Sequence, residues 1–158
     1  MNQIMQDNNL SETLKHEAIG RALCAKWTAE WADDSDQQTL IDKYKSGIDF
    51  VIKQGEWPTN DFIKANFDRE LLHDNLIFVD EGIDLKCAPS GIYVLNGECS
   101  GRLWFGEWAA ATIFVRHNSK IKIEADRFAK IFVRLYDNAE VEYDIDESAV
   151  VKVYDRRK

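Results

Sequence analysis

The chain has 158 residues, of which 45% are hydrophobic and 30% are charged, and its formal net charge is −8. This apolar content suffices for one packed domain and excludes wholesale disorder, and no run approaches the roughly 18 apolar residues that span a membrane. Residues 1–112 include 10 basic and 19 acidic side chains, whereas residues 113–158 include 10 and 9. The acidic balance disfavours nucleic acid as a partner and confines any anion site to the second half of the chain.

The first ten residues, MNQIMQDNNL, have no basic stretch followed by an apolar one, so the sequence predicts no signal peptide. The three cysteines, Cys24, Cys87 and Cys99, lack C-x-x-C spacing and are expected to be reduced thiols. We therefore expect a cytoplasmic protein, or a virion-associated one if a phage encodes it, with no membrane partner.

The first half of the chain has the four-residue period of amphipathic helices. A helix is predicted from Ser11, because apolar side chains recur every fourth residue on two adjoining strips. The strips are Leu10, Leu14, Ala18 and Ala22, and Ile19, Leu23, Trp27 and Trp31. The stretch DDSD at Asp33–Asp36 lacks EF-hand spacing, so we interpret it as a turn in which Ser35 or Asp36 caps the next helix.

A second helix is predicted over Gln37–Gln54, with an apolar stripe along one side and Gly55 at its C-terminal cap. A third, shorter helix is predicted through Phe62 and Phe67. Three short helices cannot easily bury all their apolar faces in one another. We therefore expect this helical N-terminal region, residues 1–74, to pack on the second half of the chain.

From Ile77 onward the period shortens to two, and short runs are rich in β-branched and aromatic residues, as in β-strands. A longer sequence repeat is also present, since Val115, Val133 and Val151 recur at intervals of 18 residues. A fixed period near 20 residues predicts a β-solenoid, in which each coil buries its apolar row on the next. An antiparallel β-meander or barrel with about nine residues per strand and turn produces the same repeat.

We therefore predict an α+β fold with N-terminal helices packed on a short C-terminal β-solenoid of about 18 residues per coil, the two forming one compact unit. The β-repeat region is residues 75–158, and the antiparallel meander or barrel is the alternative. Alternation along the strands places the repeated valines in the core and places Arg116, Arg134 and Lys152 in one outward column. Like charges at strand spacing repel, so this column requires acidic neighbours, an anionic ligand or an oligomer contact.

The outward strand face around this column is the candidate binding surface. Its predicted members are Phe114, Arg116, Phe132, Arg134, Tyr136, Lys152 and Tyr154, with Trp104 and Trp108 from an earlier coil. Flat aromatic rings beside basic groups suit an anionic ligand, and exposed tryptophans suit a sugar. Capping of the solenoid end or docking of the helices is the structural interpretation of the same tryptophans.

The sequence has no catalytic constellation. The histidines have no metal-ligand spacing with one another or with a cysteine, and the phosphate-loop, G-x-S-x-G and H-E-x-x-H motifs are missing. An enzyme would need a pocket that gathers His117, Cys99 or the pair Asp144 and Asp146. We therefore predict no catalytic residue, no metal site and no cofactor.

Three stretches, PTNDFIKANFDRELLHDNLIFVDE, GIYVLNGECSGRLWF and IFVRHNSKIKIEA, resemble an uncharacterised family of small proteins from phages and mobile elements of gut bacteria. The resemblance covers most of the chain, from about Leu23 to Arg156. It implies a phage-related role, as a virion or assembly component or as a small factor acting on host machinery, and it implies no activity or functional residue. The repeated half also resembles a short piece of the β-solenoid of bactofilin-type filament proteins, a likeness of fold alone.

From these observations we predict a non-enzymatic structural or interaction protein that is phage-related. It would bind a protein partner, or associate with itself as a homo-oligomer, through the β face, because an open solenoid end invites pairing. A module that binds a carbohydrate or a small anion on the aromatic and basic strand face is the alternative prediction.

Overall fold

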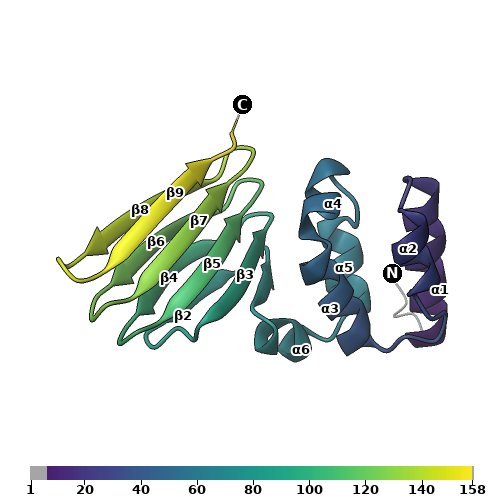
Figure 1. Cartoon of the computed structure of the whole chain (residues 1–158), viewed down its shortest axis with the longest axis horizontal. Helices are drawn as coiled ribbons and strands as arrows, with labels where there is room; N and C mark the ends of the chain where they lie inside the picture. Colours follow the sequence, from purple (N-terminus) through teal and green to yellow (C-terminus); the bar gives the residue numbers. More distant parts are fainter. Residues whose placement is uncertain (1–6, 158) are drawn as a thin grey trace. The chain divides into compact units, whose positions relative to one another are not determined.

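The computed structural model describes residues 7–157, which form six helices followed by nine strands (Figure 1). The predicted α+β class is confirmed. The chain divides into two compact units, Met1–Leu72 and His73–Lys158, so the helical part and the strand-rich part are described separately.

Each helix expected from the sequence is divided into two shorter ones. They are α1 (Asp7–Gly20), α2 (Ala25–Ala29), α3 (Gln37–Ser46), α4 (Ile48–Lys53), α5 (Asn60–Asn66) and α6 (Arg69–Asp74). The first break follows Gly20, where Ala22 has a φ of 68°. The second lies at Gly47, where a Cβ would be 3.3 Å from the ring of Trp27. The third lies at Phe67, whose backbone is extended.

The helical unit is held by helix caps and by two buried indoles. Asp36 is the N-cap of α3, as predicted, and accepts a hydrogen bond from the Thr39 amide at 2.8 Å. The indole nitrogen of Trp31 donates to the Ser11 hydroxyl at 3.0 Å. The two buried indole rings, those of Trp31 and Trp57, are part of a core that consists of Leu10, Leu14, Ala18, Trp31, Leu40 and Trp57.

The strand-rich unit is a parallel β-solenoid. Its strands are β1 (Ile77–Val79), β2 (Gly82–Leu85), β3 (Gly91–Asn96), β4 (Ser100–Phe105), β5 (Ala110–Val115), β6 (Lys120–Ala125), β7 (Lys130–Leu135), β8 (Glu140–Ile145) and β9 (Val150–Asp155). Successive strands alternate between two sheets, ordered β1-β3-β5-β7-β9 and β2-β4-β6-β8 (Figure 1). Every registered pair is parallel, so the solenoid is confirmed and the antiparallel alternative is wrong.

A coil is 20 residues long from β3 onward, and not about 18 as the valine repeat predicted. Ala110 pairs with Lys130, and Lys130 pairs with Val150. The first coil is shorter, since Gly82 pairs with Ser100. Because 18 and 20 are both even, the sequence-based register is wrong by two positions along the strand, yet residues inside the strands keep their predicted faces. Arg116 and Tyr136, predicted on strands, lie in corners instead.

From β4 onward each coil consists of two six-residue strands and two four-residue corners. The fourth residue of each corner is small and buried, because it lies where the two sheets meet. In one column of corners these residues are Ser119 and Ala139, and in the other they are Ala109, Ala129 and Ala149. The corners thereby join the sheets around one continuous core.

Alternate strand residues form that core. The inward row of β6 is Ile121, Ile123 and Ala125, and that of β7 is Ile131, Val133 and Leu135; all are at most 3% exposed. At an earlier coil, Tyr93 and Phe105 meet edge to face with ring centroids 5.6 Å apart. At the first coil, the His73 ring stacks on Phe78 at 4.9 Å.

We predict that Gly101→Ala destabilises the solenoid. Gly101 adopts a φ of 137°, and a Cβ there would lie 1.8 Å from the carbonyl oxygen of Ile83 on the neighbouring strand. The substitution should lower the free energy of unfolding by at least about 2 kcal/mol, because it combines backbone strain with a clash against backbone atoms. Urea unfolding followed by circular dichroism measures the loss.

Gly82→Ala is the matched control, since Gly82 lies on the strand paired with β4 and a Cβ there would meet nothing within 4 Å. Its free energy of unfolding should stay within about 0.5 kcal/mol of the wild type. Equal losses in the two variants would contradict the close approach of β2 and β4 at Gly101.

Candidate functional site

The nine residues of the predicted binding surface lie on three different surfaces of the solenoid. Phe114, Phe132, Arg134, Lys152 and Tyr154 are outward residues of β5, β7 and β9, and Arg116 and Tyr136 are the first residues of the corners that follow β5 and β7. Trp104 belongs to β4, in the other sheet, and Trp108 belongs to the corner between β4 and β5.

The predicted column of basic side chains does not exist. With a 20-residue coil, Arg134 lies between Phe114 and Tyr154, and Lys152 lies beside Phe132. Arg116 is in a corner and not beside Arg134. Basic and aromatic side chains therefore alternate from coil to coil, which removes the like-charge repulsion expected from the 18-residue register.

The first part of this face is a packed network. Arg116 is buried and donates from its Nη1 atom to the side-chain oxygen of Asn96 at 2.8 Å. The guanidinium of Arg134 lies over the Phe114 ring, 5.5 Å from its centroid, and the Tyr136 ring stacks on Phe114 at 6.3 Å. The exposed residues of the face are those nearer its end, Phe132, Lys152 and Tyr154.

Two exposed aromatic rings form a pair on the corners that follow β4 and β6. Trp108 is 67% exposed and Phe128 is 51% exposed, and their rings stack at 4.7 Å with an interplanar angle of 14°. Both residues have positive φ, of 59° and 66°, which bulky side chains rarely adopt. Trp108 is among the residues predicted from the sequence, whereas Phe128, which follows it by 20 residues, is not.

The groups that an enzyme would need are not brought together. Cys99 is buried and donates to the Asn96 carbonyl, and burial raises the pKa of its thiol. His117 instead accepts a hydrogen bond from the Gly97 amide at its Nδ1 atom, 2.7 Å away. Asp146 caps its own corner by accepting from Ser148, which lowers the pKa of the carboxyl. Within residues 7–157, no group of three or more His, Cys, Asp or Glu side chains is placed to hold a metal ion.

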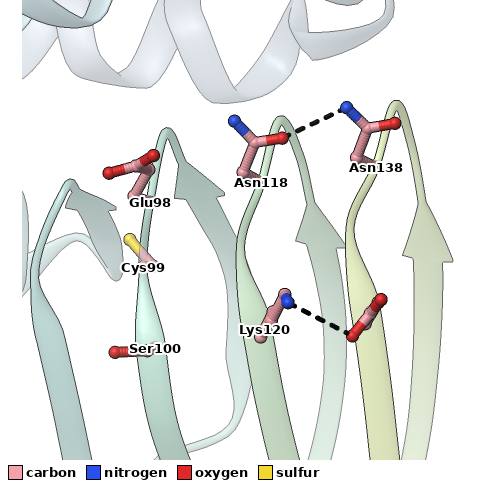
Figure 2. Close-up of a pocket in the computed structure, with 7 residues that line it drawn as sticks. Glu98, Cys99, Ser100, Asn118, Lys120 and Asn138 are labelled. Carbon is pink, nitrogen blue, oxygen red and sulfur yellow. Dashed lines mark hydrogen bonds and ion pairs between the residues drawn. The ribbon is translucent and has the colours of Figure 1, made fainter.

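A shallow hollow runs along the other column of corners (Figure 2). It is lined by Glu98, Cys99, Ser100, Asn118, Lys120, Asn138 and Glu140. Its polar groups bond to one another from coil to coil: the Asn138 amide donates to the Asn118 oxygen at 3.2 Å, and Lys120 forms an ion pair with Glu140 at 3.8 Å. These contacts form a structural ladder that joins successive coils.

The surface at the end of the solenoid contains only two of the nine predicted residues, Lys152 and Tyr154. We call β8, β9 and the corner between them the terminal coil, residues 140–155. Its inward residues continue the core columns, yet Tyr143 is 51% exposed and Val153 is 36% exposed. The residues paired with them one coil earlier, Ile123 and Val133, are 0% exposed. The terminal coil therefore presents core side chains to solvent.

One corner of this end is nevertheless closed by a side chain. Arg157 donates from Nη1 to the Ala139 carbonyl at 3.2 Å and from Nη2 to Asp155 at 2.6 Å. The side-chain hydrogen bond to Arg157 lowers the pKa of Asp155 to about 2. The equivalent carbonyl one coil earlier, that of Ser119, accepts from the Glu140 amide of the next coil. Arg157 thus satisfies a carbonyl that another coil would otherwise use.

Comparison with protein families, with curated proteins and with solved structures gives no match to this chain. The resemblance to phage and mobile-element proteins therefore stays a prediction. Across residues 7–157, none of the helices has the length and apolar character needed to cross a bilayer.

We predict that Trp108→Asn leaves the solenoid as stable as the wild type, within about 1 kcal/mol, because asparagine tolerates the left-handed backbone and the lost ring contact is worth about that much. Trp104→Asn is the matched control: Trp104 is half-buried in the middle of β4, so its loss should be at least about 1 kcal/mol larger. Urea unfolding compares the two. A larger loss for Trp108→Asn would show that the exposed ring serves the fold.

Proposed function

We propose that this chain is a non-enzymatic structural and interaction protein that assembles through the terminal coil of its solenoid. The observation that supports the proposal most directly is the exposure of core side chains at that coil, described above for Tyr143 and Val153. The phage-related role implied by the sequence resemblance is part of the proposal and concerns the setting in which such an assembly would act.

Backbone hydrogen bonding supports the same surface. Among residues 7–157, β8 pairs only with β6, and β9 pairs only with β7, so each strand has one edge without a neighbouring strand in this part of the chain. Unpaired strand edges are templates for the addition of another strand. Here two such edges lie at the same end of the solenoid (Figure 1). The exposed inward residues Tyr143 and Val153 belong to these two strands. A partner that adds strands would satisfy the edges and cover these side chains together.

The two ends of the solenoid are not equivalent. At the first coil, the inward residues Phe78 and Ile83 are buried, and the His73 ring stacks on Phe78. β1 and β2 have three and four residues, against six in β8 and β9. The longer edges and the exposed core row thus occur together at the C-terminal end, which favours this end as the assembly surface.

We expect Val153→Lys to weaken assembly by at least about tenfold, because a charge in the inward row would have to be buried by the partner. Ile92→Lys is the matched control, since Ile92 is an exposed apolar residue of β3, three strands away from β9 in the same sheet. Light scattering after size exclusion gives the mass of each variant. A wild-type monomer at all accessible concentrations would overturn the proposal, as would equal masses for wild type and Val153→Lys.

Carbohydrate binding is the second candidate function, and the stacked pair Trp108 and Phe128 favours it. A carboxylate lies near this corner: the Oδ1 atom of Asp126 is buried and has no hydrogen-bond partner among residues 7–157. A Cβ on Gly106 would lie 3.9 Å from that oxygen and 3.7 Å from the ring of Trp104. The exposed rings of Trp108 and Phe128 give a flat apolar face that suits stacking on a sugar, whereas the Asp126 oxygen is buried and does not reach that face. Binding of a small anion has less support, because the buried Arg116 guanidinium already donates to Asn96.

A glycan panel read by tryptophan fluorescence tests the sugar candidate. If a sugar stacks on this corner, its affinity should fall at least about fivefold for Trp108→Ala, because stacking on an aromatic ring contributes about 1–3 kcal/mol. Tyr154→Ala, an exposed aromatic on β9, is the control and should bind as the wild type does. A panel without any response would remove this candidate.

A further inference from the structure

We propose that the occupant of the terminal coil is a second copy of this chain, joined end to end about a two-fold axis, with β8 of each copy antiparallel to β9 of the other. This inference rests on the proposed function and specifies its partner and geometry. It follows from the direction of the two free edges, from the charges beside them and from the spacing of the inward row.

Strand direction restricts how a second copy can meet this end. β8 crosses one sheet and β9 returns along the other, so the two free edges run in opposite directions (Figure 1). A head-to-tail stack would need a matching free end at the first coil, where the strands are shorter and His73 covers Phe78. A two-fold contact instead uses the same surface twice, and it makes the facing strands antiparallel.

Two antiparallel arrangements remain, and charge distinguishes them. The outward residues of β8 are all acidic, namely Glu140, Glu142 and Asp144, whereas those of β9 are Val150, Lys152 and Tyr154. If β8 faced its own counterpart, acidic side chains would lie opposite acidic side chains, which destabilises a strand pair. If β8 faces β9 of the second copy, its acidic row meets the only cation of the facing outward row.

The inward residues are compatible with the register that pairs Glu142 with Lys152. When Glu142 lies directly opposite Lys152 of the second copy, antiparallel counting places Tyr143 opposite Val151 and Val141 opposite Val153. Directly opposed residues point to the same side of a sheet, so these four side chains all face the interior. One register therefore pairs the opposite charges outside and joins the two cores inside.

The symmetry doubles each contact. Every interface contains two pairs of Glu142 with Lys152, one on each sheet, and two sets of apolar contacts. Cross-strand ion pairs contribute about 0.2–1 kcal/mol each, and like charges in the same place cost a similar amount. Reversal of one charge per chain turns two attractive pairs into two repulsive ones, so dimerisation should weaken on the order of tenfold.

Charge reversal tests this geometry in the full chain. Glu142→Lys and Lys152→Glu should each weaken the dimer on the order of tenfold, measured as the dissociation constant by sedimentation equilibrium. The double variant Glu142→Lys/Lys152→Glu should dimerise as the wild type does, since both pairs are restored. An equimolar mixture of the two single variants should form a heterodimer. Lys130→Glu, an exposed outward residue of β7 beside Val150, is the control and should leave the constant unchanged.

The outcomes separate this inference from the proposed function. If the wild type associates but the double variant stays as weak as the single ones, the pairing of β8 with β9 is wrong while assembly through the terminal coil stands. The same holds if neither single variant is weakened, which is expected when each strand faces its own counterpart. A wild-type monomer removes both. Circular dichroism of each variant confirms that the solenoid is folded, so a loss of mass reports association alone.

Discussion

From β4 onward, four-residue corners alternate with six-residue strands and hold each coil of the solenoid in register with the next. The backbone continues this register through the corners, because the Lys120 amide donates to the Cys99 carbonyl and the Glu140 amide donates to the Ser119 carbonyl. The buried fourth corner residue must be small, since it lies between the two sheets. One extra residue in a strand would reverse which side chains face the core. The core rows, the outer columns and the open terminal coil all follow from this constraint.

The strands and their faces could be predicted from the sequence, because alternation of apolar and polar residues is a local property. The length of a coil could not be predicted from the valine triplets, because they occupy unlike positions. Val115 ends β5 and precedes a corner, whereas Val133 lies inside β7. A better signal was the small residue at every corner: Ala109, Ala129 and Ala149 recur at intervals of 20. In the helical part, an uninterrupted apolar stripe concealed the breaks, since the contact of Trp27 with Gly47 depends on tertiary packing.

The candidate surfaces were less predictable than the fold. An outward column needs the register to within one residue, so the predicted column of basic side chains is wrong. Arg134 and Lys152 point outward as predicted but lie at different positions along their strands, and Arg116 lies in a corner. The exposure of Tyr143 and Val153 could not be predicted for another reason. Their sequence pattern is that of core residues, and they are exposed because they lie in the terminal coil. Conversely, Arg116 has the sequence character of a surface residue and is buried beside Asn96.

Parallel stacking of equal coils gives this architecture an unusual tolerance of changes in length. Duplication of one coil, such as residues 110–129, would add one strand to each sheet and leave both ends of the solenoid unaltered. Removal of ten residues, by contrast, would exchange the sheets of all later strands and join corners of the two different columns. A chain of this kind can therefore lengthen or shorten in steps of one coil, by tandem duplication or loss of coils. Recombination can thereby change the length of the solenoid while its two terminal surfaces stay the same.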